Sequence, residues 1–314
     1  MRIGALIVTT GLPRISGVTA LLSPVGTISS GQRMISAFQS AGVTLTGLVV
    51  GPEDKKAERQ LVQNGVIFLR CEDADADFFH GVKQGLRFMQ DKFDRVFLVP
   101  GDTPLFLPST LEAMLQSTAS MVIPEKKYIS GYPLLLDKTA MVFILSQEDM
   151  LSAETAIRNG ALSLESISVE DSGILIRGED MSHRETLIQQ HNSQLARPVT
   201  EVLLCSGMPL YDPQLSMLLH LIQDTRSVRD ACSLMQISYS AAWNMLNRVE
   251  DELGFPLVNR IRGGASGSGS VLTERGSYLM NAYDRFSEDL GKTAKVLYDK
   301  FFGNLPEANT EGNL

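Results

Sequence analysis

The segment 226–276 constrains the fold of this chain most strongly, because it repeats the signals that begin and end short helices. Ser227 and Ser238 each precede a run of helix-forming residues and can accept a hydrogen bond from its first turn. The second run, 239–253, repeats apolar residues at helical spacing, which predicts a buried face. That face consists of Ala242, Met245, Val249 and Leu253. The pattern therefore predicts two short helices joined by a tight turn.

A β-hairpin is predicted directly after the second helix. Two short β-type runs flank a glycine- and serine-rich tip, Arg260 and Arg262 lie at the stem, and Thr273 can cap a further helix. This order of elements is typical of a winged helix-turn-helix, in which the second helix enters the major groove of DNA. Short polar side chains on that helix can reach base edges, and arginines on the hairpin suit phosphate.

Three surfaces of this module are the candidate DNA contacts: the two helix starts, the outer face of the second helix and the hairpin. They supply Ser227, Ser238, Tyr239, Ser240, Asn244, Asn247, Arg248, Arg260 and Arg262. Two other interpretations stay open at this point. The segment could be a small helical bundle whose polar face is only solvated, or a winged helix that binds protein.

The charge of the module bears on how it would bind DNA. From Arg226 to Arg275 there are six arginines, no lysine and five acidic residues, a local balance of +1 in a chain whose net charge is −8. Such a weak charge gives little non-specific attraction to phosphate and a shallow salt dependence. Useful affinity would have to come from clustered arginines, base-edge contacts and dimerisation.

The string ISYSAAWNMLNRVEDELGFPLVNRIRGG, followed by LTERG, resembles the DNA-binding domain of the molybdate-responsive, LysR-type regulators. Those proteins carry a similar SY-x-x-AW helix, then LG-x-P-L-V-x-R-x-x-GG and LT-x-x-G. The resemblance covers about a third of the chain, from near Asp212 to the end of the last helix. It implies a winged helix-turn-helix that binds double-stranded DNA as a homodimer.

Upstream, residues 1–145 alternate buried β-type runs with helical segments. The β-type runs are IGALIVTT, LTGLVVG, GVIFLR, RVFLVPGD and SMVIP, and the helical segments are SGQRMISAFQSAG, AERQLVQNG, FHGVKQGLRFMQDK and STLEAMLQ. Alternation of this kind predicts an α/β fold, a Rossmann-like parallel sheet with helices on both faces. Two further runs, ESISV and GILIR, are candidate strands.

We expect four segments along the chain: an α/β domain at 1–195, a linker at 196–212, the DNA-binding domain at 213–305 and a frayed tail at 306–314. The last helix repeats apolar residues along one face. They are Leu279, Tyr283, Phe286, Leu290, Ala294, Leu297 and Phe301. A stripe of this length favours a dimer helix, and a core within the domain is the alternative.

Two weak signals in the first domain gain meaning together. Gly11 lies in a turn after the first strand, where backbone amides can approach a phosphate chain, and Asp102 ends another strand, where a carboxylate can hold Mg²⁺. Because ligands bind beyond the carboxyl ends of parallel strands, both belong to one candidate nucleotide site. Its residues are Thr10, Gly11, Arg14, Gly101 and Asp102, with Asp102 as the metal ligand. Asp102 could instead cap the helix that begins near Pro108.

The order of these motifs resembles the nucleotidyltransferases of molybdenum-cofactor maturation, which join CMP or GMP from CTP or GTP to molybdopterin. That family carries AAG-x-S-x-RMG-x-x-K, GD-x-P and G-H-P, for which this chain has TTGLPR at 9–14, GDTP at 101–104 and GYP at 131–133. The resemblance covers residues 1 to about 180 and implies a site for a nucleotide with Mg²⁺.

Several positions depart from that family's pattern. Thr19 stands near the family's lysine, Pro13 removes a backbone donor from the phosphate loop, and Arg177 stands where the first late aspartate would be, while Glu179 and Asp180 remain. Losing a charge-stabilising lysine costs on the order of a hundredfold in rate, but binding can survive the loss. We therefore expect an inactive or weak enzyme domain that senses a nucleotide or a molybdopterin-related ligand. An active cytidylyl- or guanylyltransferase fused to a DNA-binding domain is the alternative.

Other residues point to no further chemistry. The three cysteines and four histidines fit no metal or redox spacing. The N-terminal apolar run is too short for a signal peptide, and no run reaches the length of a membrane span. The sequence thus predicts a cytoplasmic transcriptional regulator whose partners are DNA, a second copy of itself and a small ligand, with no membrane association.

Overall fold

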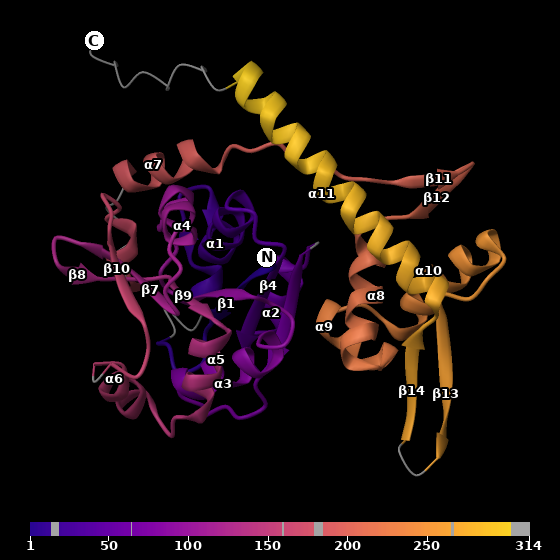
Figure 1. Ribbon diagram of the computed structural model, residues 1–314, viewed down its shortest axis with the longest axis horizontal. Helices are drawn as coiled ribbons and strands as arrows, with labels where there is room; N and C mark the ends of the chain where they lie inside the picture. The colour runs from indigo at the N-terminus through magenta and orange to yellow at the C-terminus, as the bar shows by residue number, and fades with distance from the viewer. Residues whose placement is uncertain (14–18, 64, 159, 179–184, 265–266, 303–314) are drawn as a thin grey trace. The chain divides into compact units, whose positions relative to one another are not determined.

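The computed structural model divides the chain into two compact units, Met1–Ala196 and Arg197–Leu314 (Figure 1). It describes residues 1–13, 19–63, 65–158, 160–178, 185–264 and 267–302. The expected tail at 306–314 lies outside these residues. Each unit has its own core and is described by itself below.

The N-terminal unit is built on one eight-stranded sheet with the strand order β10-β7-β9-β6-β1-β4-β5, and β8 pairs with β7. The strands are β1 (Ile3–Val8), β4 (Leu45–Val50), β5 (Val66–Arg70), β6 (Arg95–Pro100), β7 (Met121–Lys126), β8 (Ile129–Ser130), β9 (Leu134–Asp137) and β10 (Leu164–Ser168). The five strands predicted before residue 145 are all present, and ESISV forms β10. The sheet is mixed, however, because β9 runs antiparallel to both β6 and β7. The chain reaches β9 through the short β7–β8 hairpin, and without a crossover helix it has to return antiparallel.

Helices cover both faces of this sheet, as predicted (Figure 1). One face packs against α1 (Ser30–Ser40), α2 (Lys55–Leu61) and α4 (Pro108–Leu115), and the other against α3 (Phe78–Met89) and α5 (Lys138–Ser146), while α7 (Glu185–Leu195) contacts α1 and α4. The unit also contains α6 (Met150–Arg158), the 3₁₀ helices η1 (Ala20–Leu22) and η2 (Gly173–Leu175), and the small hairpin of β2 (Pro24–Val25) and β3 (Ile28–Ser29). Neither α5 nor α6 was predicted from the sequence.

The predicted strand GILIR is wrong, since Gly173–Leu175 form η2. The Asp171 carboxylate accepts a hydrogen bond of 2.8 Å from the Gly173 amide, which bends the chain. Gly173 also lies directly against the backbone carbonyl of Leu105, where a side chain would not fit. Gly173 therefore packs against the Leu105 backbone instead of pairing with a neighbouring strand.

A buried polar cluster attaches α7 to α1. Arg33 on α1 is fully buried, and its Nε donates to the carbonyl of Val25 at 2.6 Å. Its Nη1 donates to Asn192 Oδ1 at 2.7 Å and lies 3.3 Å from His191 Nδ1. His191 is fully buried too, and its contact with Arg33 provides a polar partner for one ring nitrogen.

The C-terminal unit contains α8 (Pro213–Thr225), α9 (Val228–Met235), α10 (Tyr239–Leu253), the wing strands β13 (Val258–Gly264) and β14 (Gly267–Leu272), and the long helix α11 (Glu274–Phe302). A hairpin of β11 (Leu204–Ser206) and β12 (Met208–Tyr211) precedes them. The ring of Tyr211 packs 4.6 Å from that of Tyr283 on α11, whose hydroxyl donates to Val202 O at 2.7 Å. The first part of α11 is thereby fixed to the small domain.

The apolar stripe of α11 changes character along the helix. Tyr283 is buried, but Phe286, Leu290, Leu297 and Phe301 are exposed in the single chain, Phe286 to 55%. None of the described helices is long and apolar enough to cross a membrane. The distal half of α11 thus presents apolar side chains to solvent.

Protonation of His191 provides a test of the α1–α7 cluster. Burial and the neighbouring Arg33 guanidinium lower the pKa of His191 to about 3, from an ordinary value of 6.5. Between these values the unfolded chain binds a proton that the folded chain does not, so the free energy of unfolding falls as the pH is lowered from 7 towards 4. One such proton contributes at most about 1.4 kcal/mol per pH unit.

We expect His191→Gln to reduce this pH dependence, measured by urea unfolding followed by far-ultraviolet circular dichroism at pH 7, 6 and 5. His80→Gln, an exposed histidine on α3, is the matched control and should keep the wild-type slope. An unchanged slope in His191→Gln would contradict the assignment.

Candidate nucleotide site and nucleic-acid interface

The parallel pairing of β1 with β6 brings the predicted nucleotide residues together. Val8 is opposite Pro100, so the loops that follow both strands leave the sheet at one edge, and the Gly101 amide donates to Val8 O at 2.8 Å. Thr10, Gly11, Gly101 and Asp102 all belong to these loops. Arg14 lies outside the described residues.

Gly11 is required by the fold itself. Its φ is +69°, and a Cβ would lie 2.5 Å from the amide nitrogen of Phe78 at the start of α3. Both the left-handed backbone and this close approach exclude other residues. Thr10, next to it, is buried, and its hydroxyl has no hydrogen-bond partner among the described residues.

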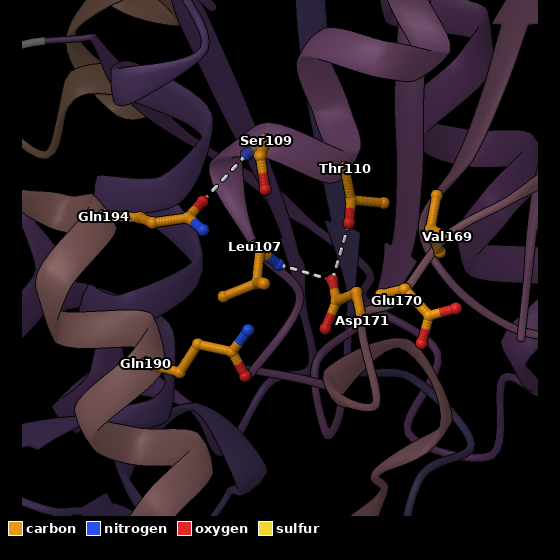
Figure 2. Close-up of a pocket in the computed structure, with 8 residues that line it drawn as sticks. All are labelled: Leu107, Ser109, Thr110, Val169, Glu170, Asp171, Gln190 and Gln194. Carbon is orange, nitrogen blue, oxygen red and sulfur yellow. Dashed lines mark hydrogen bonds between the residues drawn. The ribbon is translucent and has the colours of Figure 1, made fainter.

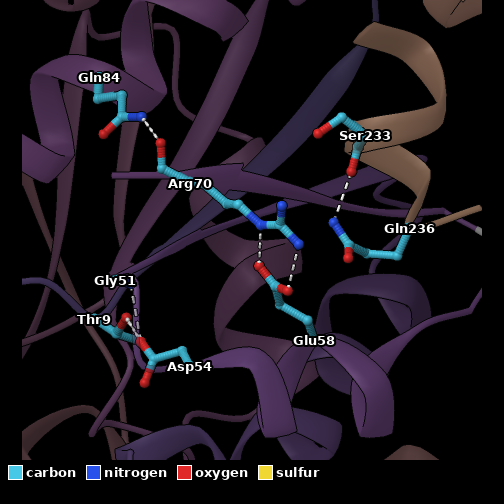
Figure 3. Close-up of polar contacts among 8 residues, drawn as sticks. All are labelled: Thr9, Gly51, Asp54, Glu58, Arg70, Gln84, Ser233 and Gln236. Atoms are coloured by element: carbon cyan, nitrogen blue, oxygen red, sulfur yellow. Dashed lines mark hydrogen bonds and ion pairs between the residues drawn. The ribbon is translucent and has the colours of Figure 1, made fainter. Parts of the chain in front are cut away.

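A second acid at this edge, Asp54, closes the loop after β4. Its Oδ2 accepts from the Gly51 amide at 3.0 Å and lies 3.3 Å from the Thr9 hydroxyl (Figure 3). Figure 3 also shows Arg70, which pairs through two nitrogens with Glu58 at 2.6 and 2.7 Å. Asp54 and Glu58 therefore make their hydrogen bonds within the fold, and neither was predicted as a site residue.

Asp102 is held by Arg177. Arg177 Nε donates to Oδ1 and Nη2 lies beside Oδ2, both at 3.2 Å, while the Asp102 side chain is only 7% exposed. The Gly178 amide donates to the Asp102 carbonyl at 3.0 Å, and the Arg177 guanidinium lies 5.9 Å from the centre of the Tyr132 ring. The Arg177 substitution noted in the sequence therefore contacts the candidate metal ligand directly.

The alternative role of Asp102, as cap of the helix near Pro108, is wrong. Asp171 makes that contact: its Oδ2 accepts from the Leu107 amide at 2.7 Å and from the Thr110 hydroxyl at 2.8 Å. Burial raises the pKa of Asp171, and the hydrogen bonds from Leu107, Thr110 and Gly173 oppose that rise. Asp171 is a structural residue.

A pocket of about 260 Å³ lies beside this cap (Figure 2). It is lined by Leu107, Ser109, Thr110, Val169, Glu170, Asp171, Gln190 and Gln194. Gln194 on α7 accepts from the Ser109 amide at 3.1 Å, and the Asp171 carboxylate occupies the helix start. The pocket contains none of the predicted nucleotide residues, and a carboxylate at the helix start opposes the binding of an anion there.

In the C-terminal unit the two predicted helix caps are present. Ser227 Oγ accepts from the Asp230 amide and Ser238 Oγ from the Ala241 amide, both at 3.1 Å. The buried face of α10 differs from the predicted face. Ala242, Leu246 and Val249 are buried, while Met245 and Leu253 are half-buried. Leu246 follows Ala242 by four residues and therefore lies at the centre of the stripe.

The outer face of α10 is polar and open. Its exposed residues are Tyr239, Ser240, Asn244, Asn247, Arg248, Asp251 and Glu252. The first five are the predicted DNA contacts, and three of them lie in the N-terminal half of the helix, after the Ser238 cap. A helix that enters the major groove contacts base edges with such a row.

Trp243 connects this helix to the wing. The Arg260 guanidinium of β13 lies 4.0 Å from the centre of the Trp243 ring, and the Tyr239 ring meets the indole edge-on at 6.1 Å. Trp243 belongs to the recognised SY-x-x-AW string, but no role was predicted for it. Its spacing of four from Tyr239 is the signal that places both rings together. The side chain of Arg262 lies outside the described residues.

Two backbone contacts fix the wing at its stem. Glu250 Oε1 on α10 accepts from the amides of Leu257 and Val258 at 2.6 and 3.1 Å. On the other strand, the Ser270 amide donates to Arg226 O at 2.8 Å. The wing is therefore oriented by α10 and by the corner between α8 and α9.

Comparison with known families assigns a type to each unit. Residues 14–159 match the family model described as MobA-like NTP transferase domain, and residues 214–277 match the bacterial regulatory helix-turn-helix proteins of the lysR family. The chain joins an NTP transferase-like domain to a LysR-family helix-turn-helix. Both resemblances inferred from the motifs are confirmed.

The helix-turn-helix region is similar to ModE. The transcriptional regulator ModE of Yersinia pestis is 35% identical over 88 residues, which are 28% of this chain and 34% of that protein. The DNA-binding transcriptional dual regulator ModE of Escherichia coli (strain K12) is 34% identical over 88 residues, with the same coverage. This chain thus spans about a third of the length of the curated relatives it matches.

Solved structures share the nucleotidyltransferase-like fold. Rv0371c from Mycobacterium tuberculosis H37Rv aligns with a TM-score of 0.51 and 16% identity over 60% of this chain and 97% of that chain. A nucleotidyl transferase from Methanothermobacter thermautotroptrophicus aligns with a TM-score of 0.51 and 18% identity over 61% and 98%. Rv0371c has also been solved in complex with manganese (TM-score 0.46). At these identities the likeness concerns the fold alone.

The Arg260–Trp243 contact can be measured directly, because Trp243 is the only tryptophan of the chain. Arg260→Ala uncovers one face of the indole, so we expect stronger acrylamide quenching of tryptophan fluorescence than in the wild type. Arg229→Ala removes an exposed arginine from α9 and is the matched control. Equal quenching in both variants would rule out the contact in solution.

Proposed function

We propose that this protein is a cytoplasmic transcriptional regulator that binds DNA through its C-terminal unit. The observation that carries the proposal is the open polar face of α10 beside the arginine-bearing wing, in a region that matches the LysR-family helix-turn-helix. A merely solvated bundle would not need a wing fixed to the helix by Glu250 and Trp243.

In this proposal the DNA-binding domain is 213–305, and α10 enters the major groove. Asn244, Asn247 and Arg248 contact base edges, while Tyr239, Ser240 and the helix caps Ser227 and Ser238 lie near the backbone. Arg260 and Arg262 hold the phosphates beside the groove. Trp243 keeps Arg260 on the side of the wing that adjoins α10.

We further propose that the protein binds DNA as a homodimer through α11. The support is the exposed apolar stripe of its distal half, which a second copy of the helix would cover. Two helix-turn-helix units on two half-sites compensate for the weak positive charge of one unit.

For the N-terminal unit we propose a sensor of a nucleotide or a molybdopterin-related ligand. The loops after β1 and β6 form one edge, as a nucleotide site requires. Thr19 stands where the related enzymes carry a lysine and is buried, so that charge stabilisation of a leaving pyrophosphate is missing there. Ligand binding without transfer is therefore favoured over an active transferase. A ligand changes DNA affinity only if it binds two arrangements of the dimer unequally, and the linker 196–212 and α11 are where we expect them to differ.

The DNA interface is tested by the double variant Asn244→Ala/Arg248→Ala. We expect its affinity for a 30-base-pair duplex, selected by the wild type from random sequence, to fall about tenfold to a hundredfold, since base contacts of this kind contribute roughly 1–3 kcal/mol each. Fluorescence anisotropy gives the dissociation constant. Asn281→Ala/Arg285→Ala is the matched control, because it removes the same residue types at the same spacing from the exposed surface of α11. Unchanged binding by the α10 variant would remove the assignment of the recognition helix.

The sensor is tested by calorimetric titration of the full chain with CTP and with GTP. We expect saturable binding to the wild type and at least about tenfold weaker binding to Asp102→Ala, because the Arg177 guanidinium at this edge loses the carboxylate that holds it in place. Asp91→Ala, an exposed aspartate at the opposite end of β6, is the control. Identical titrations of Asp102→Ala and wild type would show that nucleotides do not bind at this edge.

A further inference from the structure

We infer that the Arg177 guanidinium takes the place of the divalent cation in the N-terminal unit. The fold family implies a metal ion at the carboxylate after β6, which here is Asp102. The residues around Asp102 do not fit such an ion, since a protein cation already neutralises this carboxylate. The inference deepens the proposed ligand site and rests on it for the ligand, but its test requires neither nucleotide nor DNA.

Both carboxylate oxygens of Asp102 are engaged by one side chain. Arg177 Nε donates to Oδ1 and Nη2 lies beside Oδ2, each at 3.2 Å, in the two-point arrangement that a planar guanidinium makes with a carboxylate. Thr103 Oγ1 lies 3.4 Å from Oδ1 as well. Because Asp102 is 7% exposed, little open surface remains on the carboxylate. Mg²⁺ requires near-octahedral oxygen ligands at about 2.0–2.1 Å and keeps several waters, whereas the guanidinium already lies against both oxygens of this carboxylate.

The backbone holds Arg177 in this position. The Gly178 amide donates to the Asp102 carbonyl at 3.0 Å, so the residue after Arg177 is tied to the residue that Arg177 contacts. The Tyr132 ring lies beside the guanidinium at 5.9 Å, and the Tyr132 amide donates to Ile174 O at 3.0 Å. Segments around Asp102, Tyr132 and Gly178 therefore hold the Arg177–Asp102 ion pair in place.

A second carboxylate for a metal is missing from the described residues around this edge. Asp54 is committed to the Gly51 amide and lies beside Thr9. Among the residues that the structure describes, no three histidine, cysteine or acidic side chains come together as a metal site. Glu179 and Asp180 lie outside those residues.

The exposed half of Arg177 indicates which ligand can bind at this edge when a guanidinium replaces the metal ion. Its side chain is 48% exposed, so donors that are not used by Asp102 are accessible to an anionic ligand such as a phosphate group. A guanidinium can bind such a group but cannot lower the pKa of a bound water or bridge two phosphates as a metal does. The edge is therefore suited to holding a phosphorylated ligand without metal.

The test is a titration of the metal-free full chain with Mn²⁺ alone, with free Mn²⁺ followed by electron paramagnetic resonance. We expect wild type and Asp102→Asn to bind Mn²⁺ equally weakly, because Asp102 contributes nothing while Arg177 covers it. Arg177→Ala should gain one Mn²⁺ per chain with an apparent dissociation constant at least about tenfold lower, since a repelling cation has been removed. The double variant Arg177→Ala/Asp102→Asn should lose that gain.

Two outcomes would overturn the inference. One is a Mn²⁺ site in the wild type that Asp102→Asn abolishes, and the other is an Arg177→Ala protein, folded by circular dichroism, that gains no Mn²⁺. Should the alanine variant unfold, Arg177→Gln keeps a hydrogen bond to Asp102 without the charge and makes the same comparison. A failure of CTP and GTP to bind would count against the sensor proposal and leave this result unaffected.

Discussion

The register of β1 against β6 decides where ligand chemistry can occur in the N-terminal unit. Because Val8 is opposite Pro100, the loops 9–13 and 101–107 begin side by side, and every candidate ligand contact of this unit depends on that pairing. These loops are also closely packed against their neighbours. Gly11 lies directly against the start of α3, and Gly173 lies directly against the carbonyl of Leu105. A shift of the register by one residue would move Thr10 and Gly11 relative to Asp102 and turn every side chain of the strand to the opposite face.

An arginine is fixed by a neighbouring side chain at both candidate sites. In the N-terminal unit Arg177 is held by the Asp102 carboxylate, and in the C-terminal unit Arg260 lies on the Trp243 ring. In each case a side chain with large conformational freedom is restrained before any ligand arrives, which lowers the entropy cost of binding. The two arrangements differ in charge: the Asp102 pair is neutral as a unit, whereas the stacked Arg260 keeps its full positive charge for phosphate.

The sequence predicted what depends on local periodicity and missed what depends on contacts between distant segments. Buried β-type runs and helical spacing identified the five parallel strands, and Ser227 and Ser238 marked the two helices of the turn motif. The antiparallel β9 was missed because its short apolar run LLLD has no periodicity that distinguishes strand from helix. GILIR was assigned wrongly because Leu105, whose carbonyl lies directly against Gly173, is distant from it in sequence, and no periodicity shows that the neighbouring Asp171 bends the chain. At the sites, the motifs located Asp102 and α10, but the Asp102–Arg177 and Trp243–Arg260 contacts join residues that are separated by loops, whose path no spacing reveals.

The arginine-only composition of the DNA-reading segment has a consequence for regulation. Between Arg226 and Arg275 there is no lysine, so lysine acetylation cannot remove a positive charge from this segment. The positive charge of this segment is therefore independent of lysine acetylation, and in the proposed regulator a change in DNA affinity has to come from the geometry of the protein.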